Sequence, residues 1–288
     1  MIPRLLPLLA FLSVPLGAQT LVFSENFGTL ADSTAVTNTT TDFNYRTGYG
    51  TVAITNPSGT NAALEITSTG SGNVVTGLGV SGLTASSVYT VSFSVNLSQL
   101  PGGTSLRFAM GQSGGTLYPA QGANPPRIDN STNYAAWAAQ SLFVVNLGGN
   151  GALGSDFGLL GSMDSTGSFT QVDNSVVFSP GATHTIRLVA NGGTGSITLG
   201  AATVGAGQLG VYVDETFVGS VVMSNSVAAD EFVIYSHGRS ANGDFAQGII
   251  DNVQVWQGAI APIPEPASVA ALLGATVLAG AALRLRRR

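Results

Sequence analysis

The sequence contains no cysteine and no lysine, and only 9% of its 288 residues are charged. Without cysteine, disulfides, thiolate metal sites and thiol catalysis are all excluded. A chain of this kind must be held together by its apolar core, which a bound ion can assist.

Positive charge is scarce between the two ends of the chain. Fifteen acidic residues stand against ten basic ones, and five of the arginines lie within the body: Arg46, Arg107, Arg127, Arg187 and Arg239. The body is therefore acidic, which excludes nucleic acid as a partner because phosphates require a basic surface. An acidic surface is compatible with binding cations.

Apolar residues and turn-forming residues are both abundant, at 44% hydrophobic with 38 glycines. Disordered chains show the opposite balance of low hydrophobicity and high charge. Short β-rich runs recur between turn residues, and Val91–Val95 alternates apolar and polar side chains as a half-buried strand does. The predicted strands are 21–23, 51–55, 64–67, 88–97, 105–110, 142–147, 176–179, 185–190, 209–213, 217–223, 231–235 and 249–256.

This density of strands predicts one all-β domain, a β-sandwich or jelly roll, over residues 19–260. Ser131–Gln140 is the only helix candidate in the body, and it is short. No repeat of fixed period is visible, which argues against a solenoid or propeller.

The N-terminus has the three parts of a secretory signal over residues 1–18. Arg4 supplies the positive charge, Leu5–Leu16 the apolar stretch and Gly17-Ala18 the small residues before a cut. We therefore expect the Sec translocon and signal peptidase as partners. An uncleaved membrane anchor is the alternative, but the apolar run is short and is broken by Pro7 and Pro15.

Residues 261–288 form a distinct tail with an uncharged stretch at about 267–283. A helix of that length is roughly 25 Å long, a little short of a bilayer core of about 30 Å. Four arginines in the 284–288 cluster follow it and would hold that end in the cytoplasm, with the body outside: Arg284, Arg286, Arg287 and Arg288. A buried helix of a soluble domain is the alternative, and it leaves the arginine cluster unexplained.

Just before this stretch stands Pro264-Glu265-Pro266. The motif, the apolar span and the terminal arginines, in this order, resemble a PEP-CTERM sorting signal. The resemblance covers about residues 262–288. It implies that Pro264, Glu265 and Pro266 are a processing site for an exosortase, a membrane protease-transpeptidase that recognises the motif. The prolines also suit a stiff spacer, and the two interpretations are compatible.

The second half of the body has a further pattern. His184–Asn191 is followed by a Gly-rich turn, Gly210–Val218 contains Tyr-Val-Asp within a hairpin, and Ile250–Trp256 closes the chain with Asp-Asn-Val. The pattern over residues 183–256 resembles concanavalin A-like jelly rolls, including laminin-G-like modules. Glu215 stands where that family usually has glycine. The resemblance implies a jelly-roll body.

Catalytic motifs are present only as fragments. Gly111–Gly115 fits the nucleophile pattern Gly-x-Ser-x-Gly but is not followed by a helix, and Gly77–Gly82 fits a dinucleotide fingerprint but leads into a strand. The acidic pairs Asp214-Glu215 and Asp230-Glu231 are adjacent, so in extended strands their side chains point to opposite faces.

Neither histidine, His184 or His237, has a recognisable catalytic partner in the sequence. We therefore expect no enzymatic activity. The absence of both a carboxylate dyad and a Ser-His-Asp constellation supports that interpretation.

Calcium is the metal that the body is suited to bind. Glu25 and Asn26 follow the first predicted strand, and Asp251 and Asn252 lie in the last. Jelly rolls commonly pair these two strands, which would bring four hard oxygen ligands together. Turn capping and solvated edges are the alternative roles for the same residues.

A long segment, residues 112–140, contains Tyr118, Tyr134 and Trp137 among Gly, Pro and Asn. Long loops are often functional, and aromatic faces there can stack on sugars. The alternative is that these rings cap one end of the core.

Together these features predict an exported bacterial surface or extracellular-matrix protein with a non-enzymatic jelly-roll body. The body would be structural, or would bind glycans such as extracellular polysaccharide. A secreted carbohydrate-active enzyme of the same fold class is the alternative.

Processing at both ends can be checked by intact-mass analysis of protein extracted from the cell surface. We expect a mature form that lacks residues 1–18 and ends near Pro264–Pro266. Retention of Arg288 on every mature molecule would leave a simple membrane anchor in place of a sorting signal.

Overall fold

The computed structural model describes residues 19–36, 43–46, 50–68, 73–99, 104–111, 141–148, 159–163, 169–173, 178, 181–223, 228–237 and 247–261. Every regular element in these ranges is a β-strand, as the sequence predicts. No helix within them is long and apolar enough to cross a membrane. The predicted signal, the sorting tail and the helix candidate Ser131–Gln140 lie outside the described residues.

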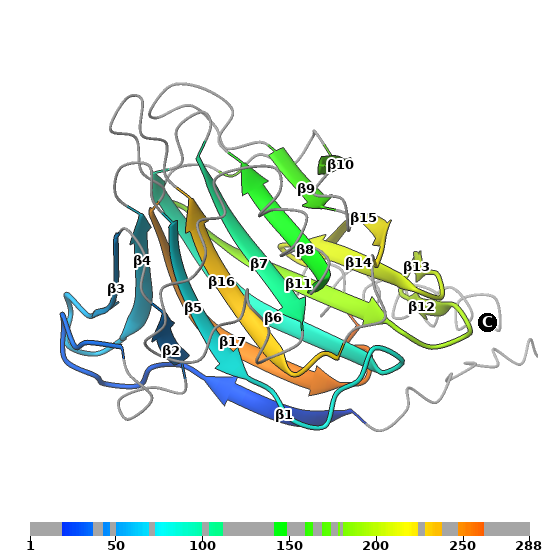
Figure 1. Cartoon of the computed structure of the whole chain (residues 1–288), viewed down its shortest axis with the longest axis horizontal. Helices are drawn as coiled ribbons and strands as arrows, with labels where there is room; N and C mark the ends of the chain where they lie inside the picture. The colour runs from blue at the N-terminus through cyan, green and yellow to red at the C-terminus, as the bar shows by residue number, and fades with distance from the viewer. Residues whose placement is uncertain are drawn as a thin grey trace, which may run out of the picture.

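One antiparallel sheet has eight strands. Its order is β15 (Thr216–Val222), β14 (Gln208–Val213), β11 (Thr183–Asn191), β6 (Val88–Gln99), β17 (Gln247–Gln257), β4 (Ala63–Ser68) and β3 (Gly50–Thr55), and β1 (Thr20–Glu25) also pairs with β17. In Figure 1, β1 in blue runs beside β17 in orange along one edge of the molecule.

The second antiparallel sheet has seven strands. Its order is β10 (Phe169–Asp173), β9 (Leu159–Met163), β8 (Ser141–Gly148), β7 (Ser105–Gly111), β16 (Glu231–His237), β5 (Asn73–Gly79) and β2 (Phe43–Arg46). A separate hairpin of β12 (Ile197–Leu199) and β13 (Ala202–Val204) completes the described elements.

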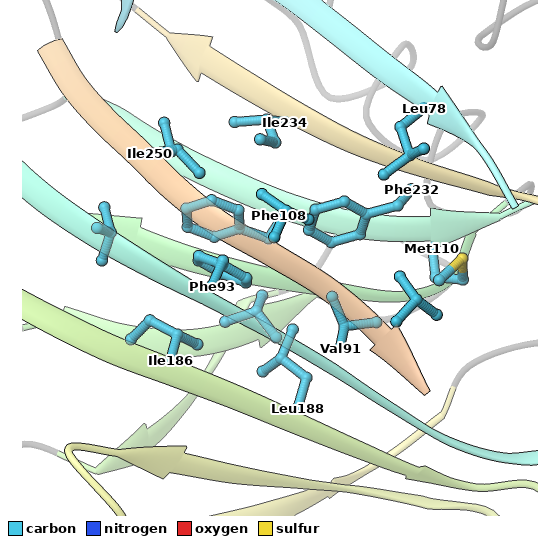
Figure 2. Close-up of a cluster of buried hydrophobic side chains, with 14 of the residues drawn as sticks. Leu78, Val91, Phe93, Phe108, Met110, Ile186, Leu188, Phe232, Ile234 and Ile250 are labelled. Atoms are coloured by element: carbon cyan, nitrogen blue, oxygen red, sulfur yellow. The ribbon is translucent and has the colours of Figure 1, made fainter. Parts of the chain in front are cut away.

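The two sheets pack face to face around one apolar core. Phe93 on β6 meets Phe108 on β7 with ring centroids 4.3 Å apart, and Phe232 on β16 lies 5.9 Å from Phe93. Figure 2 shows these rings between the layers with Ile250 and Ile186 close by. Aromatic side chains bury large apolar areas, so this contact is the centre of the sandwich.

The last strand lies inside the sheet and not at its edge. On one side β17 pairs with β6; on the other it pairs first with β4 and then with β1. The change of partner coincides with a bulge between Asp251 and Gln254, where Asn252 has a φ of 53°. A bulge bends a strand and re-aims its side chains. The predicted pairing of the first and last strands is thus confirmed.

Most predicted strands are present with their boundaries extended by one or two residues. The prediction missed the strands with few β-branched or aromatic residues or with short length: β2, β5, β9, β10, β12 and β13. Gly77 and Gly79 of the dinucleotide-like motif belong to β5, an ordinary strand of the seven-stranded sheet. Of the predicted strand at 176–179 only Phe178 is described, as a buried residue.

The backbone at Gly192 lies in close contact with residues 85–87, and this contact predicts how a substitution at Gly192 changes the stability of the fold. Its N–H donates to the Ser87 carbonyl at 3.0 Å, and a Cβ at this position would overlap the carbonyl oxygen of Ala85. Gly192→Ala should therefore lower the free energy of unfolding by about 3 kcal/mol, at the upper end of overpacking costs. Gly195→Ala, where a Cβ meets nothing within 4 Å, is the matched control. If chemical denaturation gives the two variants equal stabilities, the close contact between Gly192 and Ala85 is contradicted.

Candidate functional site

The four predicted calcium ligands lie at the junction where β17 changes partner. Glu25 pairs with Val253, so the end of β1 is beside the bulge formed by Asp251 and Asn252. The chain then turns sharply, because Phe27 and Gly28 both have positive φ, at 54° and 56°. The structure therefore brings both predicted pairs to the point where β17 exchanges β4 for β1 as its partner.

Side chains at this junction also hold the turn in place. The Glu25 carboxylate accepts a hydrogen bond from the Phe27 N–H at 2.7 Å, and the Asn26 side-chain oxygen accepts one from the Gly28 N–H at 3.1 Å. Such contacts are typical of acidic and amide side chains in turns. The turn-capping role is thus present, and each carboxylate has further lone pairs for a second role.

Asp251 has the least favourable environment of the junction. It accepts from the Asn252 N–H at 2.6 Å and from the Asn61 amide at 3.5 Å, yet burial raises the pKa of its carboxyl group above the usual range. A desolvated carboxylate is stabilised by a nearby cation. Asn61 lies two residues before the start of β4, and the sequence prediction missed it because only the sheet register places it beside Asp251.

Oxygen donors from carboxylates and amides are those that Ca²⁺ prefers. Within the described ranges no group of three or more His, Asp or Glu side chains is placed to hold a metal ion. A cation at the junction would therefore depend on the carboxylates of Glu25 and Asp251 together with amide or backbone oxygens. We propose this junction as a structural Ca²⁺ site on that donor chemistry.

A second candidate site lies on the outer face of the seven-stranded sheet. Leu106, Phe108 and Met110 of β7 face the core, so the alternating residue Arg107 faces outward. Register places Tyr235 of β16 and Asn146 of β8 on either side of Arg107. These three residues, Tyr235, Arg107 and Asn146, are called the polar row below.

The polar row is fixed by its own contacts. The Arg107 Nε–H donates to the Asn146 side-chain oxygen at 2.7 Å, and the Arg107 guanidinium lies 5.3 Å from the centre of the Tyr235 ring. The three residues are 0% to 8% exposed. A buried cation stacked on an aromatic ring is held in one orientation, so the row is a fixed and largely covered polar cluster.

One end of this face is where residues 112–140 join the sheet. Gly111 ends β7, Ser141 begins β8, and the two are cross-strand partners. Glu231, which is 1% exposed, pairs with Gly111 from the neighbouring β16. The predicted glycan-stacking residues Tyr118, Tyr134 and Trp137 belong to this connection and lie outside the described residues.

The hairpin predicted at Gly210–Val218 is confirmed, with its turn at Asp214 and Glu215 between β14 and β15. Both residues have positive φ, at 47° and 65°, so the argument that an extended strand points their side chains to opposite faces does not apply to this pair. Asp214 accepts a bond from His184 at 2.7 Å, and Glu215 pairs with Arg187 at 2.7 Å. His184, for which no partner was expected, thus has a carboxylate neighbour that only strand pairing brings close.

Comparison with known proteins identifies the fold. A carbohydrate recognition domain of Emp47p superposes with a TM-score of 0.51 at 11% identity, covering 83% of this chain and 98% of that one. Lectin II from Ulex europaeus has a TM-score of 0.48 at 10% identity, covering 83% and 98% of the two chains. Domain 4 of the arabinanase AbnA from Geobacillus stearothermophilus, in complex with arabinotriose, has a TM-score of 0.42 at 15% identity, covering 85% and 95%.

No family model matches the sequence, and neither does any curated protein sequence. At these identities the structural likeness shows the fold alone. The body is an all-β, lectin-like jelly roll, which confirms the fold that the sequence predicts for it. The sorting motif Pro264–Pro266 and the arginine cluster at 284–288 lie outside the described residues.

The raised pKa of Asp251 gives the calcium proposal a measurable signature. Because burial favours its neutral form, the metal-free protein loses stability as pH rises from the unfolded pKa near 3.8 through the higher folded pKa. Asp251→Asn removes this cost while keeping the acceptor for the Asn252 N–H. We therefore expect this variant to melt at a higher temperature than the unmodified protein at pH 7 in EDTA.

Added Ca²⁺ should make the unmodified protein melt at a higher temperature than Asp251→Asn. Calorimetry of residues 19–288 in mild detergent measures both melting temperatures. A ligand at a hundredfold excess over its dissociation constant adds about 2.7 kcal/mol, which the unmodified protein should gain and Asp251→Asn should lose. Glu65→Gln is the control, because Glu65 contacts Thr67 and Gln247 on the same sheet and should keep the response. Identical melting curves of the unmodified protein with and without Ca²⁺ would eliminate the site.

Proposed function

We propose that this protein is a non-enzymatic, carbohydrate-binding protein of the cell surface or extracellular matrix. The observation that supports it most directly is the fold, which a carbohydrate recognition domain shares. The polar row of the seven-stranded sheet is the part of the described body that we propose lies beside the bound sugar.

The chemistry of the row suits a sugar. A guanidinium and an amide make directional hydrogen bonds to hydroxyl groups, and an aromatic ring packs against the apolar face of a pyranose. Arg107 is already oriented by Asn146 and Tyr235, so binding costs little side-chain entropy. Gly161 of β9 pairs with Asn146 in the register.

The aromatic residues of the connection between β7 and β8 would add stacking surface. Tyr118, Tyr134 and Trp137 belong to a segment that leaves and re-enters the sheet at the edge of this face. We propose that they contact the same glycan chain as the polar row. An extended polysaccharide is the ligand class that could touch both.

Export and sorting complete the proposal. The signal at 1–18, the motif Pro264–Pro266 and the arginine cluster are the features that support an exosortase-type route. The body agrees with it, because its first and last segments lie together: the Gln19 amide donates to the Ala259 carbonyl at 2.7 Å. Both proposed cleavage positions would then flank one folded unit.

One observation favours the alternative of a carbohydrate-active enzyme. Glu231 is a buried carboxyl group on the same outer face as Arg107. Glycoside hydrolysis requires a second carboxyl group about 5–10 Å away. Release of reducing ends from β-glucans by the unmodified protein, lost in Glu231→Gln, would establish this alternative.

Glycan arrays on residues 19–288, followed by calorimetric titration with the best polysaccharide, test the binding proposal. We expect Arg107→Gln and Trp137→Ala each to weaken binding by about tenfold or more, since each removes a charge-assisted hydrogen bond or a stacking surface. Thr198→Ala, an exposed change on β12, should bind as the unmodified protein does.

Arg107 is buried, so its variant must first be shown to melt cooperatively. A folded Arg107→Gln variant that binds with unchanged affinity would remove the polar row from the site. No binding to any glycan by the unmodified protein would refute the function itself.

A further inference from the structure

The last described residues, Gly258–Ala261, continue past the end of β17 and lie against the eight-stranded sheet. We call them the C-terminal strap. The Gly258 N–H donates to the Val88 carbonyl at 2.8 Å, and the Thr90 hydroxyl donates to the Gly258 carbonyl at 2.9 Å. Thr90 also accepts from the Ile260 N–H at 3.0 Å. One buried threonine therefore binds the strap on both sides of Ala259.

Two further side chains bind the strap carbonyls. Gln19, the first described residue, donates to Ala259 O at 2.7 Å, and Arg187 donates through Nη1 to Ala261 O at 2.9 Å. These contacts come from the beginning of the chain and from β11 respectively. The strap is therefore bound by parts of the body that are far apart in sequence and that meet only after folding.

Apolar contacts support the hydrogen bonds. Ala259 is 8% exposed and belongs to a small second core with Val189, Leu199 and Tyr212. Ala261 packs against the same cluster. This cluster lies outside the main core, so the strap can leave without opening the sandwich.

Because Arg187 binds Ala261, the C-terminal end of the strap is the part whose release costs the most free energy. Its side chain is only 7% exposed and its other terminal nitrogen, Nη2, binds Glu215 at 2.7 Å. The Nε of Arg187 is buried without a hydrogen-bond partner. Loss of the Ala261 carbonyl would leave this buried cation with Glu215 as its remaining partner, and an incompletely paired buried charge is strongly unfavourable.

We propose that the C-terminal strap is a latch. The folded body binds it just before the tail, and the strap must detach from the body before a protease can engage the processing motif. Pro264 is the third residue after Ala261, a reach of roughly 10 Å when extended. Proteases and other peptide-binding partners hold an extended segment of several residues through its main chain. A bound segment centred on Pro264–Pro266 would include strap residues, whose main-chain groups are occupied by Thr90, Gln19 and Arg187.

The latch rests on the proposed sorting route for its biological role, but its physical basis can be measured separately. Residues 19–288 in mild detergent are treated with elastase, which cuts after small residues, and mass spectrometry follows the fragment that begins at Ile260. Cleavage there requires opening of the strap and tracks the open fraction. We expect Arg187→Gln to raise the rate about tenfold, the effect of losing one charged hydrogen bond.

Two variants separate the latch from general destabilisation. Glu215→Gln replaces the carboxylate with a neutral amide but keeps the Arg187 bond to Ala261. Because release of Ala261 would then leave Arg187 without a charged partner, its cleavage rate should be no higher than that of the unmodified protein. Thr90→Val removes two strap bonds without touching Arg187 and should accelerate cleavage as well. Melting temperatures confirm that each variant is folded. Equal rates in the unmodified, Arg187→Gln and Thr90→Val proteins would overturn the latch.

Processing in cells then tests the role. With a working latch, Arg187→Gln is cut near Pro264–Pro266 faster than Glu215→Gln. Faster elastase cleavage with unchanged cellular processing would overturn the gating role. If no variant is processed in cells while the elastase rates still differ as expected, the sorting route fails and the latch itself stands.

Discussion

β17 pairs with strands on both of its sides, and this pairing closes the eight-stranded sheet. The final strand supplies Ile250, Val253 and Val255 to the core, and it holds β6 on one side and β4 and β1 on the other. Since the chain has no disulfide, these ladders and the aromatic contacts beneath them replace covalent closure. The calcium junction and the C-terminal strap are both direct extensions of this strand.

The fold was largely predictable because the sequences of its central strands are rich in the β-branched and apolar residues that are typical of buried strands. Val88–Leu97 and Thr185–Ala190 combine β-branched residues with burial on the inner face, and both lie in the middle of the eight-stranded sheet. β12 has three residues and β5 contains two glycines, so neither has enough periodic signal to be detected. Glu215 has a positive φ that is rare for a residue with a side chain, at the position where the jelly rolls that the sequence resembles usually have glycine.

Of the two candidate sites, one could be predicted from the sequence and the other could not. The approach of Glu25 to the Asp251 bulge was predictable, because a general rule pairs the first and last strands of a jelly roll, and the register pairs Glu25 with Val253, two residues after Asp251. The polar row was not, since Arg107, Asn146 and Tyr235 lie on three separate strands, and each looks like an ordinary member of an alternating run. Only the register of β16, β7 and β8 places them side by side.

The central position of β17 also has a consequence for folding. Thr20 pairs with Gln257, so almost the whole chain must be present before the eight-stranded sheet can close. Contacts this distant in sequence give high contact order and slow folding. A chain that emerges from its N-terminus keeps β6 and β4 as open edges until the end arrives, and open edges promote aggregation. Nascent chains therefore expose these two edges until residues 247–257 have been synthesised, and a truncation before residue 247 leaves both edges unpaired by β17.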